Sequence, residues 1–283
     1  MAATERPGLL EGKNILVMGL ISPDSFAWVI GEKAAEEGVE VTYSAVNDRF
    51  VMMARRNFRN AQVELGDRRI LECDVTSDES IKNFSEGLES QIDGLVYSIA
   101  FANPQTAMGR PSYKTPRADI HQALDISSVG FQMVVGGLLE ANKFNPSSSI
   151  VAMTFDSQRV YPNYGWMTPA KATLEAEVKL LGAELAHRGI RVYALSSGPQ
   201  TTMAASRIPG FNDIGDVWAE RAPLGWDLRE GRYSVAKHAA FFLSDYSEGA
   251  TGNVHFVDGG FNSVAMPFSP YIEQTPAENP PEI

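Results

Sequence analysis

Seven short, mostly apolar runs recur along the chain, and helical spacing of apolar residues marks most of the segments between them. The runs cover residues 14–18, 40–43, 70–73, 94–99, 149–153, 191–195 and 253–257, and the longest helical stretch covers 118–142. The runs lack strict alternation, which is typical of strands covered by helices on both faces. Strands joined by helical crossovers pair in parallel. The sequence therefore predicts an α/β fold with a doubly wound, Rossmann-like parallel sheet in a single domain.

This domain is expected to span residues 1–266, because no break in composition divides that part of the chain. The composition then changes, since residues 267–283 contain five prolines in 17 residues. Proline lacks a backbone donor and has a fixed φ, so such a segment favours neither a helix nor a sheet. We therefore expect an extended tail that is either disordered or lies on a partner.

Composition and charge exclude several classes of function. A net charge of −11 over 283 residues argues against nucleic acid as the main partner, which needs clustered Lys and Arg. The single cysteine, Cys73, excludes an internal disulfide and a metal site built on cysteines. No run approaches the roughly 18 uninterrupted apolar residues of a membrane-spanning helix. The first residues, MAATERPGLLEGKN, are charged where a signal peptide is apolar, so we expect a cytoplasmic protein.

A doubly wound sheet binds its ligand beyond the carboxyl ends of the strands, so the residues that follow each run are the candidates. After the first run the sequence is GLISPDSFA, which is not the G-x-G-x-x-G fingerprint of dinucleotide-binding proteins. Gly19 would allow a tight turn there. Ser25 and Phe26 would offer amides at a helix N-terminus, where an anion is favoured. The alternative is an ordinary capped loop.

Acidic residues after the second and third runs leave alternatives open. Asp48 would suit the ribose diol of NAD, whereas Arg49 beside it would suit the additional phosphate of NADP. Asp74 could either cap the following helix or face an adenine ring.

The stretch YPNYGWMTPAK, residues 161–171, places a phenol and an ammonium seven positions apart. At about 100° per residue, a helix over this stretch would bring Tyr164 and Lys171 to one face. It would begin near residues 163–165 and carry Pro169 at about its fourth position, where no amide hydrogen bond is lost. The alternative has Thr168 as N-cap and Pro169 first, which leaves Tyr164 on a loop. We favour the earlier start, because a Tyr and a Lys that act together need a rigid platform.

These segments resemble the short-chain dehydrogenase/reductase superfamily, and within it the divergent enoyl-acyl-carrier-protein reductases of bacterial fatty-acid synthesis. The resemblance extends to about Ala265 and rests on VMGLISPDSFA, LECDV, YSIAF, FDSQRVYPNYGWMTPAKATLEA, SSGPQTTMA, RAPLGW and VDGG. The Tyr-x6-Lys spacing of Tyr164 and Lys171 marks the enoyl reductases, whereas Tyr-x3-Lys is usual in the superfamily. The chain also holds a Tyr-x3-Lys, Tyr233 and Lys237, which we interpret as part of a packing helix.

The resemblance implies a role for each candidate residue. Tyr164 would hydrogen-bond the thioester carbonyl and stabilise an enolate, and Lys171 would hold the nicotinamide ribose. Phe155 and Met167 would form apolar walls of the acyl pocket, under an acyl-binding lid at about residues 202–222. The implied cofactor-binding residues are Gly19, Ile21, Ser25, Phe26, Asp74, Val75, Ser98, Ala100, Met153, Lys171, Gln200 and Thr202.

The implied activity is reduction of a trans-2-enoyl thioester, on acyl carrier protein or CoA, by a homotetramer that uses NADH; NADPH is not excluded. Three features depart from the family. Thr154 and Phe155 stand where many members have a second tyrosine, which resembles the mycolic-acid branch, and GPQTT replaces the usual Gly-Pro-Ile-(Lys/Arg)-Thr. The stretch between Thr202 and Arg221 is shorter than in the mycolic-acid branch, so the lid would cover less of an acyl chain. The rival interpretations are a carbonyl reductase or alcohol dehydrogenase, which favours the tighter Tyr–Lys spacing, and a non-catalytic NAD(H)-binding sensor, which needs no Tyr–Lys pair.

Overall fold

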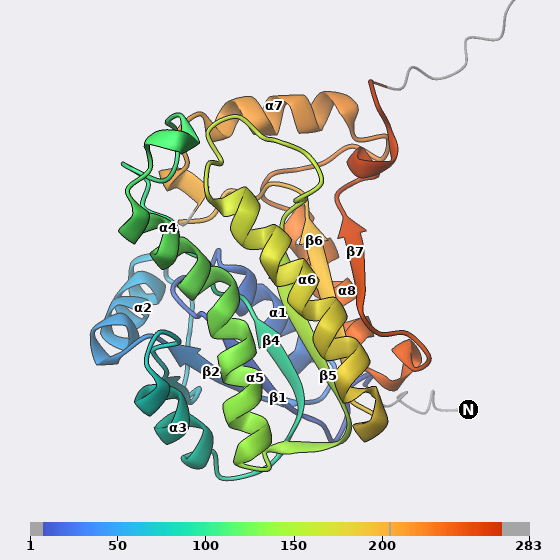
Figure 1. Ribbon diagram of the computed structural model, residues 1–283. Coiled ribbons are helices and arrows are strands. Elements are labelled where there is room, and N and C mark those ends of the chain that lie inside the picture. Colours follow the sequence, from blue (N-terminus) through green and yellow to red (C-terminus); the bar gives the residue numbers. More distant parts are fainter. Residues whose placement is uncertain (1–7, 204, 268–283) are drawn as a thin grey trace, which may run out of the picture.

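A computed structural model describes residues 8–203 and 205–267 of the chain (Figure 1). Within these residues seven parallel strands form one sheet in the order β3-β2-β1-β4-β5-β6-β7. The strands are β1 (Asn14–Met18), β2 (Glu40–Ala45), β3 (Ile70–Glu72), β4 (Ile92–Tyr97), β5 (Phe144–Thr154), β6 (Arg191–Ser197) and β7 (Asn253–Val257). Each predicted run overlaps one strand, although β5 begins five residues before its run, and the Rossmann-like fold is confirmed. The strand order reverses between β1 and β4, the switch point where such sheets bind ligands.

Helices cover both faces of this sheet (Figure 1). They are α1 (Phe26–Glu36), α2 (Asp48–Asn60), α3 (Asp78–Glu86), α4 (Arg117–Leu124), α5 (Gly130–Glu140), α6 (Met167–Leu185), α7 (Phe211–Arg221) and α8 (Gly231–Leu243). One hydrophobic core lies between the sheet and the pair α1 and α8, and a second lies between the sheet and α3, α5 and α6. Single-turn helices lie at Ser112–Lys114, Ala186–Arg188, Ala205–Arg207, Asp245–Ser247 and Phe261–Ser263.

The long helix predicted over residues 118–142 is two helices, α4 and α5, joined by a π-helical turn at Asp125–Val129. The turn is fixed by side chains: Ser127 Oγ accepts a hydrogen bond from the Phe101 amide (2.9 Å), and Ser128 Oγ donates one to the Leu124 carbonyl (2.8 Å). Among the described residues, Arg117–Glu140 is one stretch long and apolar enough to cross a membrane by length and composition alone. In this fold α5 packs against α3 beside the sheet.

A third hydrophobic cluster lies beyond the carboxyl ends of the strands, where Figure 1 shows α7 crossing the end of the molecule. It is rich in aromatic rings, and includes Tyr161, Tyr164, Trp218 and Phe261, with Phe155 packed against it. The Trp218 ring stacks on Phe261 with centroids 3.6 Å apart, which joins α7 to the segment after β7. This cluster closes the end of the sheet where a ligand is expected. The predicted tail after Pro267 lies outside the described residues.

Candidate active site

The turn after β1 needs a glycine. Gly19 has a φ of +94°, and a Cβ placed on it would lie 2.5 Å from the carbonyl oxygen of Ser98, at the end of β4. The helix that follows starts as predicted, because Ser25 is its N-cap and Phe26 its first residue. Ser25 Oγ accepts a hydrogen bond from the Trp28 amide (3.3 Å) and donates one to the carbonyl of Ser22 (2.7 Å). The tight turn and the capped α1 N-terminus thus meet at the switch point, in an arrangement suited to an anion.

Asp74 follows β3 but does not cap α3. The cap is Ser77, whose Oγ accepts a hydrogen bond from the Ser80 amide (3.2 Å). Asp74 Oδ1 instead accepts hydrogen bonds from the amide (3.0 Å) and hydroxyl (2.7 Å) of Thr76. The helix-cap alternative for Asp74 is therefore wrong: its carboxylate braces the turn at the carboxyl end of β3. Val75 beside it is buried.

The helix that carries Lys171 begins later than we predicted. α6 starts at Met167, whereas Asn163 and Gly165 have φ angles of +65° and +55°, so Tyr164 lies in a turn. A Cβ on Gly165 would collide with the carbonyl oxygen of Ala107, which accepts a hydrogen bond from the Trp166 amide (2.9 Å). This contact holds the chain against the loop after β4 and prevents an earlier helix start.

The alternative start with Pro169 as the first helical residue is also wrong. Pro169 is the third residue of α6, where the missing amide proton costs no intrahelical hydrogen bond. The turn before the helix is still ordered: the Met167 amide donates to the Tyr164 carbonyl and the Thr168 amide to that of Gly165, each over 3.2 Å. Tyr164 and Lys171 are therefore brought to the site by a turn and a helix, and not by one shared helical face.

Both members of the Tyr–Lys pair are buried. Tyr164 is 8% exposed, and burial raises the pKa of its phenol well above the usual value, so the group is a proton donor at neutral pH. Lys171 is 5% exposed, and its Nζ donates a hydrogen bond to the carbonyl of Met153 at 2.7 Å. Burial lowers the pKa of Lys171 to about 8, against the opposing effect of Glu175.

Phe155 and Met167 lie beside Tyr164. The Phe155 ring centroid is 5.0 Å from that of Tyr164 and 5.5 Å from that of Trp218. Met167 is buried in the same aromatic cluster. These contacts place apolar surface around the phenol, as expected for the wall of an acyl pocket.

Gln200 and Thr202 follow β6, but their side chains make local contacts. Gln200 Oε1 accepts a hydrogen bond from the Arg232 amide (3.0 Å) and its Nε2 donates to the carbonyl of Asp227 (3.4 Å). Thr202 Oγ1 accepts one from the Ala205 amide (3.1 Å). The glutamine of GPQTT thus ties the loop after β6 to the start of α8. Because the side chain of Gln200 is engaged in these hydrogen bonds, its predicted contact with the nicotinamide would have to come from its backbone groups.

The remaining predicted cofactor residues lie around the switch point. Ser98 is half-buried beside Gly19, and its amide donates to the Met18 carbonyl (3.3 Å). Ile21 is half-buried, and its carbonyl accepts a hydrogen bond from Asn57 Nδ2 (2.9 Å). Ala100 is exposed on the loop after β4. The structure therefore brings candidates from β1, β4, β5 and α6 to one end of the sheet.

The second tyrosine–lysine pair differs from the first in its exposure. Tyr233 and Lys237 lie on α8, both side chains are exposed, and Tyr233 is 46% accessible. A catalytic site has to exclude water. The buried pair Tyr164 and Lys171 satisfies this condition, and the exposed pair Tyr233 and Lys237 does not.

Sequence reasoning missed a buried polar network next to the aromatic cluster. The Asp156 carboxylate is 1% exposed and accepts hydrogen bonds from Tyr161 Oη (2.7 Å) and Arg159 Nη1 (2.8 Å). Burial works to raise the pKa of Asp156, but these hydrogen bonds outweigh it and hold the pKa below the usual range. Arg159 Nη2 also donates to the Asn262 carbonyl (2.9 Å). The spacing D-x-x-R-x-Y of these residues was the sequence signal for this network, but steps of three and then two positions fit neither a helix nor a strand throughout.

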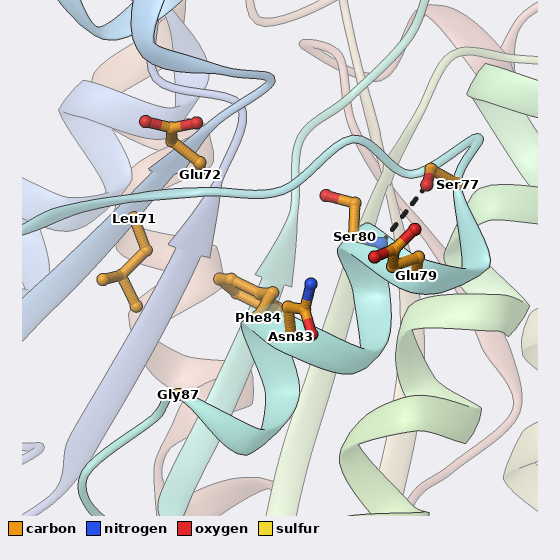
Figure 2. A pocket seen from close by; sticks show the side chains of 8 residues that line it. All are labelled: Leu71, Glu72, Ser77, Glu79, Ser80, Asn83, Phe84 and Gly87. Atoms are coloured by element: carbon orange, nitrogen blue, oxygen red, sulfur yellow. Dashed lines mark hydrogen bonds between the residues drawn. The ribbon is translucent and has the colours of Figure 1, made fainter.

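A groove of about 440 Å³ lies elsewhere, between β3 and α3 (Figure 2). Its lining residues are Leu71, Glu72, Ser77, Glu79, Ser80, Asn83, Phe84 and Gly87. None of these is a predicted site residue, and the two carboxylates disfavour an anionic ligand. In the described part of the chain, no group of three His, Cys, Asp or Glu residues is placed to hold a metal ion.

The doubly wound parallel sheet, with a tight turn and a capped helix at its switch point, is the fold of the nucleotide-dependent reductases of the short-chain dehydrogenase type. The family model described as enoyl-(acyl carrier protein) reductase matches residues 19–262. This chain therefore belongs to the enoyl-(acyl carrier protein) reductase family.

Curated relatives agree with the family match over most of their length. The enoyl-[acyl-carrier-protein] reductase [NADH] of Mycolicibacterium smegmatis is 34% identical, over 89% of this chain and 97% of the relative. The enoyl-[acyl-carrier-protein] reductase [NADH] FabI of Bacillus subtilis is 35% identical, over 90% of this chain and 98% of the relative. The Staphylococcus aureus relative, named for NADPH, is 36% identical over 90% and 98%. The family predicted from the sequence is confirmed.

Proposed function

We propose that this protein reduces the trans-2 double bond of an enoyl thioester with NADH, in fatty-acid synthesis. The observation that carries the proposal is the buried pair of Tyr164 and Lys171 at the carboxyl end of β5, within a chain of the enoyl-(acyl carrier protein) reductase family. A buried phenol with a raised pKa keeps its proton, and it can therefore donate a hydrogen bond to an oxygen that gains negative charge.

The residues around the switch point fit a dinucleotide. Gly19 allows the tight turn to lie against the carbonyl of Ser98, and the α1 N-terminus capped by Ser25 suits a pyrophosphate. Asp74 and Val75 would hold the adenine end, and Ser98 the ribose region. Lys171 would hold the nicotinamide ribose hydroxyls from its position against Met153. When bound, reduced nicotinamide supplies the hydride.

The chain's own residues would then act on the thioester. Tyr164 would donate a hydrogen bond to the thioester carbonyl and stabilise the enolate oxygen as hydride reaches the β-carbon. Phe155 and Met167 would exclude water from the reacting carbons. A proton then reaches the α-carbon and completes the saturated product.

We propose NADH as the preferred cofactor. Asn47 caps α2, and the exposed Asp48 and Arg49 follow in its first turn, next to the carboxyl end of β2. A carboxylate there repels the additional phosphate of NADPH, whereas a lone Arg offers it one cation. The relatives' names support the same order, since those from M. smegmatis and B. subtilis are named for NADH and that from S. aureus for NADPH.

We propose an acyl-carrier-protein thioester as the natural substrate, with a CoA thioester as a substitute, on the strength of the relatives' names. The lid would be residues 202–222, which contain α7. Trp218 Nε1 donates a hydrogen bond to the Asp258 carbonyl (2.9 Å). This bond fixes the Trp218 ring of α7 in the aromatic cluster that also contains Tyr164. The domain would span residues 1–266, with the proline-rich tail outside it.

We further propose a cytoplasmic homo-oligomer, a tetramer by the resemblance. Exposed apolar side chains on several helices support an assembly, among them Met133 on α5, Leu180 on α6 and Phe241 on α8. Light scattering on the purified protein tests this, and a monomer at micromolar concentration would contradict it.

The activity is tested by following the oxidation of NADH with a trans-2-enoyl-CoA and, separately, with a β-ketoacyl-CoA. We expect turnover of the enoyl substrate only. Turnover of the ketone alone would indicate a carbonyl reductase, and tight NADH binding without turnover of either would indicate a sensor.

A further inference from the structure

A buried carboxylate lies one helical turn beyond Lys171. Glu175 is 6% exposed, and each of its oxygens accepts one hydrogen bond. The hydroxyl of Thr154 donates to Oε1 at 2.8 Å, and that of Ser157 donates to Oε2 at 2.5 Å. A carboxylate taken out of water is costly unless such partners compensate it. The Glu175 carboxylate is therefore held by hydrogen bonds to residues 154 and 157, and it links α6 to the segment between them.

That segment is the start of the loop that leaves β5. Thr154 is the last residue of β5, and Phe155 and Asp156 lie between the two hydroxyl donors. One turn earlier on α6, Lys171 Nζ donates to the carbonyl of Met153, the residue before Thr154. The helix thus holds the end of β5 at successive points.

Phe155 is the residue of this loop that touches the proposed catalytic phenol. Its ring centroid lies 5.0 Å from Tyr164, 4.9 Å from Tyr161 and 5.5 Å from Trp218. Asp156 is fixed separately, by Tyr161 and Arg159. The Glu175 hydrogen bonds lie on both sides of Phe155, so they set the place of its backbone against the Tyr164 turn.

We propose that Glu175 is a positioning residue of the reductase, which fixes the loop of residues 154–157 and so holds Phe155 against Tyr164. The inference rests on the proposed function for its kinetic consequence. Its physical claim, that the carboxylate holds the loop, stands on the hydrogen bonds alone. A small displacement of a group that packs against a catalytic residue lowers the rate of the chemical step more than it lowers ligand binding.

The test compares Glu175→Ala, which loses both hydrogen bonds, with Glu175→Gln, which has the same shape and can bond both hydroxyls. Thr154→Val removes one donor at nearly constant volume, and Glu184→Gln, an exposed change on the same helix, is the control. Assays are run slightly below neutral pH, so that Lys171 stays protonated when its carboxylate neighbour is removed. The readouts are kcat with enoyl-CoA, the Kd of NADH by fluorescence, and amide hydrogen exchange in residues 154–158.

We expect Glu175→Ala to lower kcat at least about tenfold, with the Kd of NADH changed less than about twofold. Glu175→Gln should recover most of the rate. Thr154→Val should add little to the loss in the Ala variant, because that variant has already lost the hydrogen bond from Thr154. Amide exchange should accelerate most in Glu175→Ala, and it should stay unchanged in Glu184→Gln.

Three results would overturn the proposal. A Gln variant as slow as the Ala variant would mean that the charge acts on Lys171. A Kd of NADH that rises more than about twofold in Glu175→Ala would assign the residue to cofactor binding. Unchanged amide exchange in Glu175→Ala would show that other contacts hold the loop of residues 154–157. A wild-type protein without enoyl turnover would contradict the proposed function instead, and the exchange measurement would still decide the positioning claim.

Discussion

Lys171 Nζ lies 2.7 Å from the carbonyl oxygen of Met153 and donates a hydrogen bond to it. This contact joins α6 to the carboxyl end of β5 and fixes the buried ammonium group of Lys171. Because burial lowers its pKa to about 8, the state of charge of Lys171 changes within the range where enzymes are assayed.

Cofactor affinity should therefore depend on pH. The protonated Lys171 binds the ribose, so the Kd of NADH should rise as the pH passes above about 8, by up to roughly tenfold per unit. Cys73 and Tyr164 do not titrate in this window, because burial raises the pKa of Cys73 to about 12 and that of Tyr164 well above its usual value. Fluorescence titration of NADH at a series of pH values measures the profile.

The control for this prediction is Glu177, whose pKa burial raises to about 7. Glu177→Gln should leave the pH profile of NADH binding in place, and Lys171→Met should flatten it at weak affinity. A profile that is flat in the wild-type protein up to pH 9, or one that moves with Glu177→Gln, would remove Lys171 from this role.

Gly165→Ala should damage both stability and activity. The residue has a φ of +55°, and the added methyl group would collide with the Ala107 carbonyl, which holds the Tyr164 turn. We expect a loss of about 2–4 kcal/mol in the free energy of unfolding, by denaturant titration.

Gly225→Ala is the matched control, because its φ is +70° with no atom within 4 Å of the added Cβ. It should lose only about 1 kcal/mol and retain full turnover. Equal losses in the two variants would show that backbone strain alone, and not the contact with Ala107, decides the cost.

The choice of cofactor should follow the first turn of α2. The wild-type protein should show a higher kcat/KM with NADH than with NADPH. Asp48→Asn should narrow that ratio because it removes the repulsive charge, and Arg49→Ala should widen it because it removes the one cation near the additional phosphate. A better kcat/KM with NADPH in the wild-type protein would contradict the assignment.

The central strands could be predicted because they are buried on both faces, which leaves nearly continuous apolar runs such as 14–18 and 149–153. The first half of β5 was missed because Asn145, Pro146 and Ser147 interrupt the apolar pattern; Pro146 and Ser147 are exposed, and Asn145 is half-buried. α2 was not predicted, because its segment is rich in charged residues and it buries only Ala54 and Phe58, although its apolar residues share one face.

The candidate site residues were chosen from motif spacing, which does not determine the geometry of the segments that carry them. The start of α6 depends on a contact between Gly165 and Ala107, residues that are far apart in the sequence. The partners of Glu175 likewise come from the loop after β5. A helical count along one segment contains no information on either contact, so the shared-face argument placed the helix start too early.

The comparison of Tyr164→Phe with Tyr233→Phe tests the central claim most directly. Both changes remove one hydroxyl, the first from the buried turn before α6 and the second from the exposed surface of α8. Enoyl-CoA reduction is followed by the loss of NADH absorbance, and NADH binding by fluorescence. Tyr164→Phe should lower kcat roughly 10²–10³-fold with the Kd of NADH nearly unchanged, and Tyr233→Phe should leave both unchanged. A silent Tyr164→Phe together with an inactive Tyr233→Phe would contradict the account.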